Sequence, residues 1–87
     1  MARYSLRIKK TARKELEGVA TKADRRRIIK RIESLADNPR PPGSQKLSGR
    51  ERYRIRQGQY RILYTIEQRV LIVHVIKIGH RKDVYRP

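Results

Sequence analysis

Three strand-like stretches follow one another in the second half of the chain, separated by two-residue turns at Gly58-Gln59 and Gln68-Arg69. Residues 52–57 and 60–67 alternate apolar and polar side chains, as strands with one buried face do. Residues 70–78 are almost continuously apolar, which predicts a central strand covered on both faces. Because such short turns join antiparallel neighbours, the three strands are expected to form an antiparallel meander.

The first half of the chain predicts one strand followed by a helical hairpin. Residues 3–8 alternate as a half-buried strand does. Thr11 is expected to cap a first helix that reaches residues 18–20, and Thr21 begins a capping-box pattern that opens a second helix. The second helix is expected to end at Asn38-Pro39, because a residue that precedes proline avoids helical angles.

The order of these elements predicts an α+β fold with a mostly antiparallel four-stranded sheet, an N-terminal strand and a helical hairpin. Between the two halves, residues 40–49 contain Pro41, Pro42 and Gly43 and are predicted to form a loop. The 87 residues match the length of a single domain, residues 1–87. A domain of this size has a thin core, as expected for one sheet with helices against one face.

The composition is strongly basic, with 24 Lys and Arg against 8 Asp and Glu and a formal charge of +16. Such a charge attracts polyanions, and nucleic acid is the expected partner in preference to a surface that is basic only for solubility. Five cations gather early in the second predicted helix. They are interpreted as a solvated helix face in preference to direct RNA contact, although an acidic partner could also use them: Arg25, Arg26, Arg27, Lys30 and Arg31.

Other classes of site and location find little support in the sequence. There is no cysteine and there are only two histidines, so we expect no disulfide and neither a thiolate nor a multi-histidine metal site. No cofactor is expected. No apolar run approaches the length of a membrane span or a secretory signal. We therefore expect a soluble, cytoplasmic protein that does not associate with membranes.

Arginines gather on one face of the predicted β-hairpin. If Gly58-Gln59 forms the turn, Arg56 lies opposite Arg61, and Arg54 shares the face of Arg56. Two like charges opposed on a sheet are destabilising, and an anion between them would offset that cost. A phosphate fits, because each guanidinium can grip it with two parallel hydrogen bonds. The alternative is that these are ordinary solvent-facing arginines.

The C-terminal segment adds a second group of candidate residues. Arg81 follows the predicted buried strand, and Tyr85 could stack on an unpaired base or, as readily, anchor the segment by packing. His80, beside Arg81, is a candidate for proton transfer, because neighbouring cations favour the neutral imidazole that a general base requires. His74 lies within the apolar stretch and is interpreted as a structural residue.

Several runs together resemble the RelE branch of the RelE/ParE toxins, and the resemblance extends over essentially the whole chain. The most specific run is Gly79-His80-Arg81-Lys82-Asp83-Val84-Tyr85-Arg86, after Tyr53-Arg54-Ile55-Arg56 and Gly58-Gln59-Tyr60-Arg61. The resemblance implies a RelE-like microbial RNase fold and a toxin of a type II toxin–antitoxin pair. It implies a metal-independent endoribonuclease that cuts mRNA in the ribosomal A site through attack by the RNA 2′-hydroxyl. The implied partner is a small RelB-like antitoxin with an acidic segment.

The resemblance also implies roles for individual residues. Arg54 and Arg56 would bind the mRNA backbone and the scissile phosphate, and Arg61 would stabilise charge on the pentavalent phosphorus. Arg81 would stabilise or help to protonate the leaving oxygen, and Tyr85 would stack on a base. At the strand positions of Arg54 and Arg56 the family often has lysine, a candidate general base. Arginine does not readily lose its proton, which raises the standing of His80 as the base.

Two other functions remain open on the sequence. The first keeps the fold and changes the target, as in the ParE branch, whose members inhibit DNA gyrase. Those relatives usually lack the basic ending with a tyrosine, so its presence favours RNA cleavage. The second is a non-catalytic basic RNA-binding protein, which would explain the charge but would have no use for His80 beside Arg81 and for Tyr85.

Overall fold

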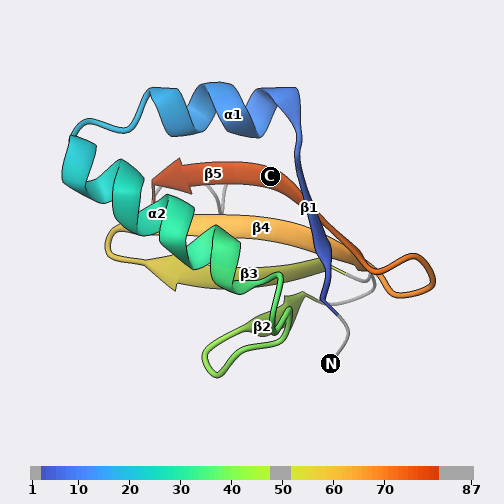
Figure 1. Ribbon diagram of the computed structural model, residues 1–87. Coiled ribbons are helices and arrows are strands. Elements are labelled where there is room, and N and C mark those ends of the chain that lie inside the picture. The colour runs from blue at the N-terminus through green and yellow to red at the C-terminus, as the bar shows by residue number, and fades with distance from the viewer. Residues whose placement is uncertain (1–2, 48–51, 81–87) are drawn as a thin grey trace.

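The computed structural model describes residues 3–47 and 52–80 and contains two helices and a five-stranded sheet. Figure 1 shows the arrangement, with α2 crossing the sheet and α1 lying along β5. The α+β class is confirmed. The predicted count of four strands is wrong, because a short strand forms where only a loop was predicted. The elements are β1 (Ser5–Ile8), α1 (Lys10–Glu17), α2 (Lys22–Ser34), β2 (Gln45–Leu47), β3 (Arg52–Gln57), β4 (Tyr60–Glu67) and β5 (Ile72–His80).

The strands lie in the order β1-β5-β4-β3-β2, so β5, the last described strand in sequence, lies inside the sheet between β1 and β4. Strands β2 to β5 pair antiparallel, which confirms the meander, and β1 pairs parallel with β5. The prediction that β5 is an interior strand with a neighbour on each side is confirmed, but its coverage on both faces is not. Ile72 and His74 are only half-buried, because both helices pack against the other face.

The limits of β5 differ from those expected. The strand begins at Ile72 rather than at residue 70, because Leu71 has a positive φ of 55° and belongs to the preceding turn. The exposed Val70 lies in the same turn. Gly79 does not end the strand, which continues to His80. The turn between β4 and β5 is therefore longer than the predicted pair Gln68-Arg69.

Helix α1 begins earlier than the sequence suggested. Its N-cap is Lys9, without a side-chain cap, so the predicted cap at Thr11 is wrong. The backbone N–H of Lys9 still bonds to the carbonyl of Val75, 2.9 Å away, and the helix starts as soon as this sheet contact ends. The capping pattern of α2 is confirmed, because the Thr21 hydroxyl accepts a hydrogen bond from the backbone N–H of Asp24 at 3.1 Å.

A single core lies between the helices and one face of the sheet. The helices contribute Ala12, Leu16, Ile28 and Ile32, and the central strands contribute Ile55, Ile62, Tyr64, Val73, Val75 and Ile78. Tyr64 is fully buried, and its hydroxyl donates to the carbonyl of Pro39 at 2.7 Å. Burial of this kind raises the pKa of Tyr64 to about 12, chiefly through desolvation.

Candidate functional site

The candidate site lies on the face of the sheet opposite to α1 and α2, which we call the helix-free face because neither described helix packs on it. Tyr53, Ile55, Ile62 and Tyr64 face the core, so alternation sends the intervening residues of β3 and β4 to the helix-free face. Arg54, Arg56 and Arg61 are thereby brought together on two neighbouring strands. We call these three residues the arginine face.

The β3–β4 hairpin fixes the register of the arginine face. Gly58 has a φ of 59°, as a glycine-first two-residue turn requires, and Gln57 pairs with Tyr60. Arg56 consequently lies directly opposite Arg61, which confirms the register predicted from the sequence. Like charges directly opposed across a sheet destabilise it, so this pair favours an anion that contacts both guanidinium groups.

Arg61 is buried, with only 4% of its surface exposed, whereas Arg56 is exposed. It is the one charged residue among the buried residues of the described ranges 3–47 and 52–80. A cation held in a site of low dielectric interacts more strongly with an anion than an exposed cation does. On its other side Arg61 pairs with Gly79 of β5, a residue without a side chain. The arrangement suits a phosphate that approaches Arg61 from the helix-free face.

Arg54 is positioned by a residue that sequence reasoning missed. Its guanidinium donates a hydrogen bond to the side-chain oxygen of Gln45, and the same two residues pair in the β2–β3 register. Gln45 belongs to β2, the strand that had been predicted as loop. The three residues of β2 are too few for an alternation signal, so only the pairing in the folded sheet reveals this contact.

His80 lies on the opposite face from the arginines. It pairs with Tyr60 in the β4–β5 register, and the two rings meet edge to face with centroids 5.7 Å apart. Tyr60 packs against the core on the helix side. His80 therefore lines a hollow of about 300 Å³ beside α1, together with Glu15, Val19 and Lys77, and does not join the arginine face.

The remaining histidine and the C-terminal candidates lie elsewhere. His74 is half-buried on the helix-free face, where its Nε2 contacts Oε1 of Glu67 near the β4–β5 turn. Arg81 and Tyr85 lie outside the described residues, so their roles stay predictions. Within the part of the chain that the structure describes, no three His, Asp or Glu side chains gather as a metal site would require. No described helix is long and apolar enough to cross a membrane.

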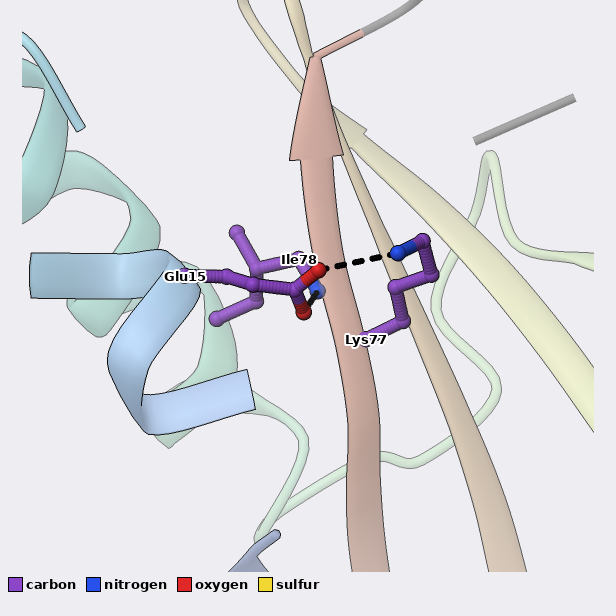
Figure 2. Close-up of polar contacts among 3 residues, drawn as sticks. All are labelled: Glu15, Lys77 and Ile78. Carbon is purple, nitrogen blue, oxygen red and sulfur yellow. Dashed lines mark hydrogen bonds and ion pairs between the residues drawn. The ribbon is translucent and has the colours of Figure 1, made fainter. Parts of the chain in front are cut away.

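Glu15 of α1 holds the part of β5 that borders Arg61. One carboxylate oxygen accepts from the backbone N–H of Ile78 at 3.0 Å, and the other contacts Nζ of Lys77 at 2.9 Å (Figure 2). The β1–β5 ladder ends at Ile8 and Val75, so β1 leaves this stretch of β5 without a strand neighbour on that side. The Glu15 carboxylate supplies the acceptor that a neighbouring strand would otherwise provide, and this fixes the strand that carries Gly79.

Comparison with known proteins identifies the family. Residues 6–85 match the family model described as the ParE toxin of the parDE type II toxin–antitoxin system. This chain belongs to the RelE/ParE superfamily of type II toxins. A RelE-like toxin protein of Escherichia coli is 29% identical to this toxin over 87 residues, covering 95% of this chain and 90% of the relative.

Solved structures place the toxin beside RelE proteins in fold. The RelE–RelB complex of Pyrococcus horikoshii has a chain with a TM-score of 0.79 at 26% identity, covering 95% of this chain and 99% of that one. The isolated Escherichia coli RelE toxin gives 0.76 at 28% identity, with 94% and 90% covered. The RelBE2 complex of Mycobacterium tuberculosis gives 0.81 at 24% identity, with 95% and 97% covered, and supports the fold alone.

Proposed function

We propose that this toxin is a metal-independent endoribonuclease that cuts mRNA in the ribosomal A site and thereby stops translation in the cytoplasm. The observation that carries the proposal is the buried Arg61 directly opposite Arg56, with Arg54 on the same face. Three guanidinium groups on rigid strands match the negative charge of a phosphodiester. These positive charges stabilise the pentavalent phosphorus more strongly than the starting phosphodiester, because its oxygens carry more negative charge and the site is organised before the reaction.

In the proposed reaction, the ribose 2′-oxygen forms a bond to the adjacent phosphorus and the bond from phosphorus to the 5′-oxygen breaks. The products are a 2′,3′-cyclic phosphate and a free 5′-hydroxyl. Arg61 and Arg56 contact the non-bridging oxygens, and Arg54, held by Gln45, contacts the backbone. Arginine stays protonated, so the proton of the 2′-hydroxyl leaves to a group outside the arginine face. The leaving 5′-oxygen takes up one proton to become the 5′-hydroxyl, and Arg81 is proposed to stabilise this oxygen or help to protonate it. Tyr85 is proposed to stack on a nucleobase.

The cognate partner is proposed to be a small RelB-like antitoxin with an acidic segment. Two observations support it. The structurally similar protein of Pyrococcus horikoshii was solved as a RelE–RelB complex. The formal charge of +16 also favours an acidic partner.

Inhibition of DNA gyrase is the second candidate function, because the matching family model is that of a ParE toxin. One experiment separates the two. Purified toxin is added to a cell-free translation reaction, and the 5′ ends of the mRNA are mapped with and without ribosomes. Codon-spaced cuts that require ribosomes support the nuclease. Intact mRNA together with trapped gyrase–DNA breaks would reject it in favour of gyrase, and intact mRNA with unaffected gyrase would reject both.

A further inference from the structure

A second cationic site lies on the other side of the β3–β4 hairpin from the arginine face. The flank of α2 that faces the hairpin carries Arg27, Lys30, Arg31 and Ser34, and Gln57 of β3 closes the space beside them. Together these five residues line a hollow of about 310 Å³, which we call the basic hollow. From the sequence we interpreted the cations of this segment as a solvated helix face. The structure shows that three of them, Arg27, Lys30 and Arg31, line a hollow.

The basic hollow concentrates like charge at a cost to the helix. Arg27 lies three and four residues before Lys30 and Arg31, and such neighbours repel one another on a helix surface. In the described ranges 3–47 and 52–80, the ion pair that reaches the hollow is that of Arg27 with Asp24, at 3.6 Å. Both side chains of that pair are exposed, so it offsets little of the repulsion. An anion bound in the hollow would offset more.

The lining identifies the kind of anion. Arg, Lys, Ser and Gln are among the side chains that contact the phosphates of nucleic acids. The Ser34 hydroxyl donates to the carbonyl of Arg31 at 2.6 Å, so the cations and Gln57 are the donors to an anion here. All five lining residues carry a polar or charged group, and the apolar part of the lining comes from their carbon stems; none of them is an apolar or aromatic anchor of the kind on which protein interfaces centre. The exposed Ile29 could serve as such an anchor, but it lies about 200° around the helix from Arg27. The composition therefore favours an RNA backbone over an acidic peptide.

The hollow and the arginine face lie back to back. Gln57 faces the helix side, and its neighbour Arg56 faces the helix-free side of the same strand. A strand of RNA held against Arg56 and Arg61 does not fill the basic hollow without passing around the hairpin. The hollow is therefore suited to a different RNA segment from the one that is cut.

We propose that the basic hollow binds a backbone phosphate of structured RNA and anchors the toxin while the arginine face engages a second RNA strand. The proposal deepens the proposed function and rests on it only for the identity of that second strand. Folded RNA offers phosphates from several strands at once, so the two sides of the hairpin can be occupied together. Binding to the hollow itself requires no cleavage.

The test measures how the affinity for RNA depends on salt. The Kd of the full chain for a fluorescein-labelled RNA hairpin is determined by anisotropy between about 50 and 200 mM KCl. Arg27→Gln with Lys30→Gln removes two cations from the hollow. The matched control, Arg13→Gln with Lys14→Gln, removes two exposed cations from α1. Thermal unfolding establishes that both variants fold as the unmodified chain does.

The hollow variant is expected to lower the slope of log affinity against log salt by about 1 to 2, and the control by clearly less. Ser34→Asp, which keeps every cation and adds a carboxylate to the hollow, is expected to weaken RNA binding as well. Equal slopes for the hollow variant and its control would overturn the proposal. So would a selective loss of affinity for a labelled peptide of alternating Glu and Ala with RNA binding retained, which would indicate a protein partner.

These outcomes do not depend on the nuclease assay. If the unmodified toxin leaves mRNA intact on ribosomes, the proposed function fails, and the salt slopes with the RNA hairpin still decide whether the hollow binds RNA. If the toxin cuts mRNA and the slopes are equal, the proposed function stands and the hollow proposal fails.

Discussion

Arg56 of β3 lies directly opposite Arg61 of β4, and only the second of the two is buried. Because they differ in burial, the two arginines are expected to contribute differently to the binding of an anion. In the proposed reaction, the buried Arg61 offers a charge that is already oriented, so little reorganisation is needed when charge develops on the phosphate. Arg56, in contact with water, adds a charge that salt screens more readily.

Replacement of Arg61 by methionine is expected to lower the rate of mRNA cleavage by about 10²–10³, by analogy with the loss of one oxyanion donor. Methionine keeps an unbranched apolar stem, so the strand still packs. The matched control is Arg52→Met, on the same face of β3 but opposite Thr65 rather than Arg61. Primer extension on mRNA from cell-free translation measures the rate. Equal activity of the two variants would exclude Arg61 from the site.

Inorganic phosphate is expected to raise the Tm of the unmodified toxin, because an anion that binds only the folded state stabilises it. The rise should be smaller in Arg56→Gln, which removes one of the two opposed charges. Without phosphate, Arg56→Gln is expected to be more stable by a few tenths of a kcal/mol, because the repulsion is gone. Differential scanning fluorimetry at constant ionic strength measures both effects. An identical phosphate response in Arg56→Gln and Arg52→Gln would count against a shared anion site.

Gln45→Ala is expected to slow cleavage about 2- to 10-fold, which corresponds to the free energy of the one hydrogen bond that positions Arg54. Arg54→Lys should retain more activity than Arg54→Ala, because lysine keeps the positive charge. Single-turnover cleavage with the three variants provides the comparison. If Arg54→Lys and Arg54→Ala were equally impaired, the forked shape of the guanidinium, rather than its charge, would be the essential feature.

Glu15→Ala is expected to reduce the free energy of unfolding by about 1–3 kcal/mol, because it removes the acceptor of the Ile78 N–H. Glu17→Ala provides the control, since Glu17 is an exposed acid on the same helix. Urea denaturation followed by circular dichroism gives both values. A loss of stability as small as that of the control would show that β5 does not depend on this contact.

Tyr64 is expected to make the fold sensitive to alkali. Its pKa is raised to about 12 by burial, from an ordinary value of 10. The neutral phenol is thus favoured in the folded state, and its contribution is fully present below pH 10 and is lost as the pH rises from 10 to 12. Tyr64→Phe should cost about 1 kcal/mol at neutral pH, because the Pro39 carbonyl loses its donor. It should also flatten the decline in stability above pH 10, and an unchanged decline would assign it to other groups.

Local signals in the sequence predicted the hairpin and with it the heart of the candidate site. The position of Gly58 and the alternation on either side are properties of neighbouring residues, so the pairing of Arg56 with Arg61 follows without knowledge of the whole fold. The capping pattern at Thr21 is local in the same way. The cap predicted at Thr11 failed because a contact with β5, distant in sequence, holds Lys9 in the sheet.

The face on which His80 lies is set by a β-bulge in β5, and nothing in the sequence indicates that bulge. In the β4–β5 ladder Leu63 pairs with Lys77 and Tyr64 pairs with Val75, which leaves Ile76 as an extra residue on β5. One inserted residue exchanges the faces of all residues beyond it. Simple alternation from His74 would have sent His80 to the arginine face, and the bulge sends it to the helix side instead.

The parallel pairing of β1 with β5 has a consequence for when the toxin becomes complete during its own synthesis. β1 acquires its partner only after the last strand has left the ribosome, and β5 is also the strand that flanks Arg61. A nascent chain that ends before residue 72 lacks β5, the strand that joins β1 to β4, so β1 is not connected to the rest of the sheet. The ribosome that makes the toxin thus finishes translating β5 before the surface that we propose to cut mRNA can form.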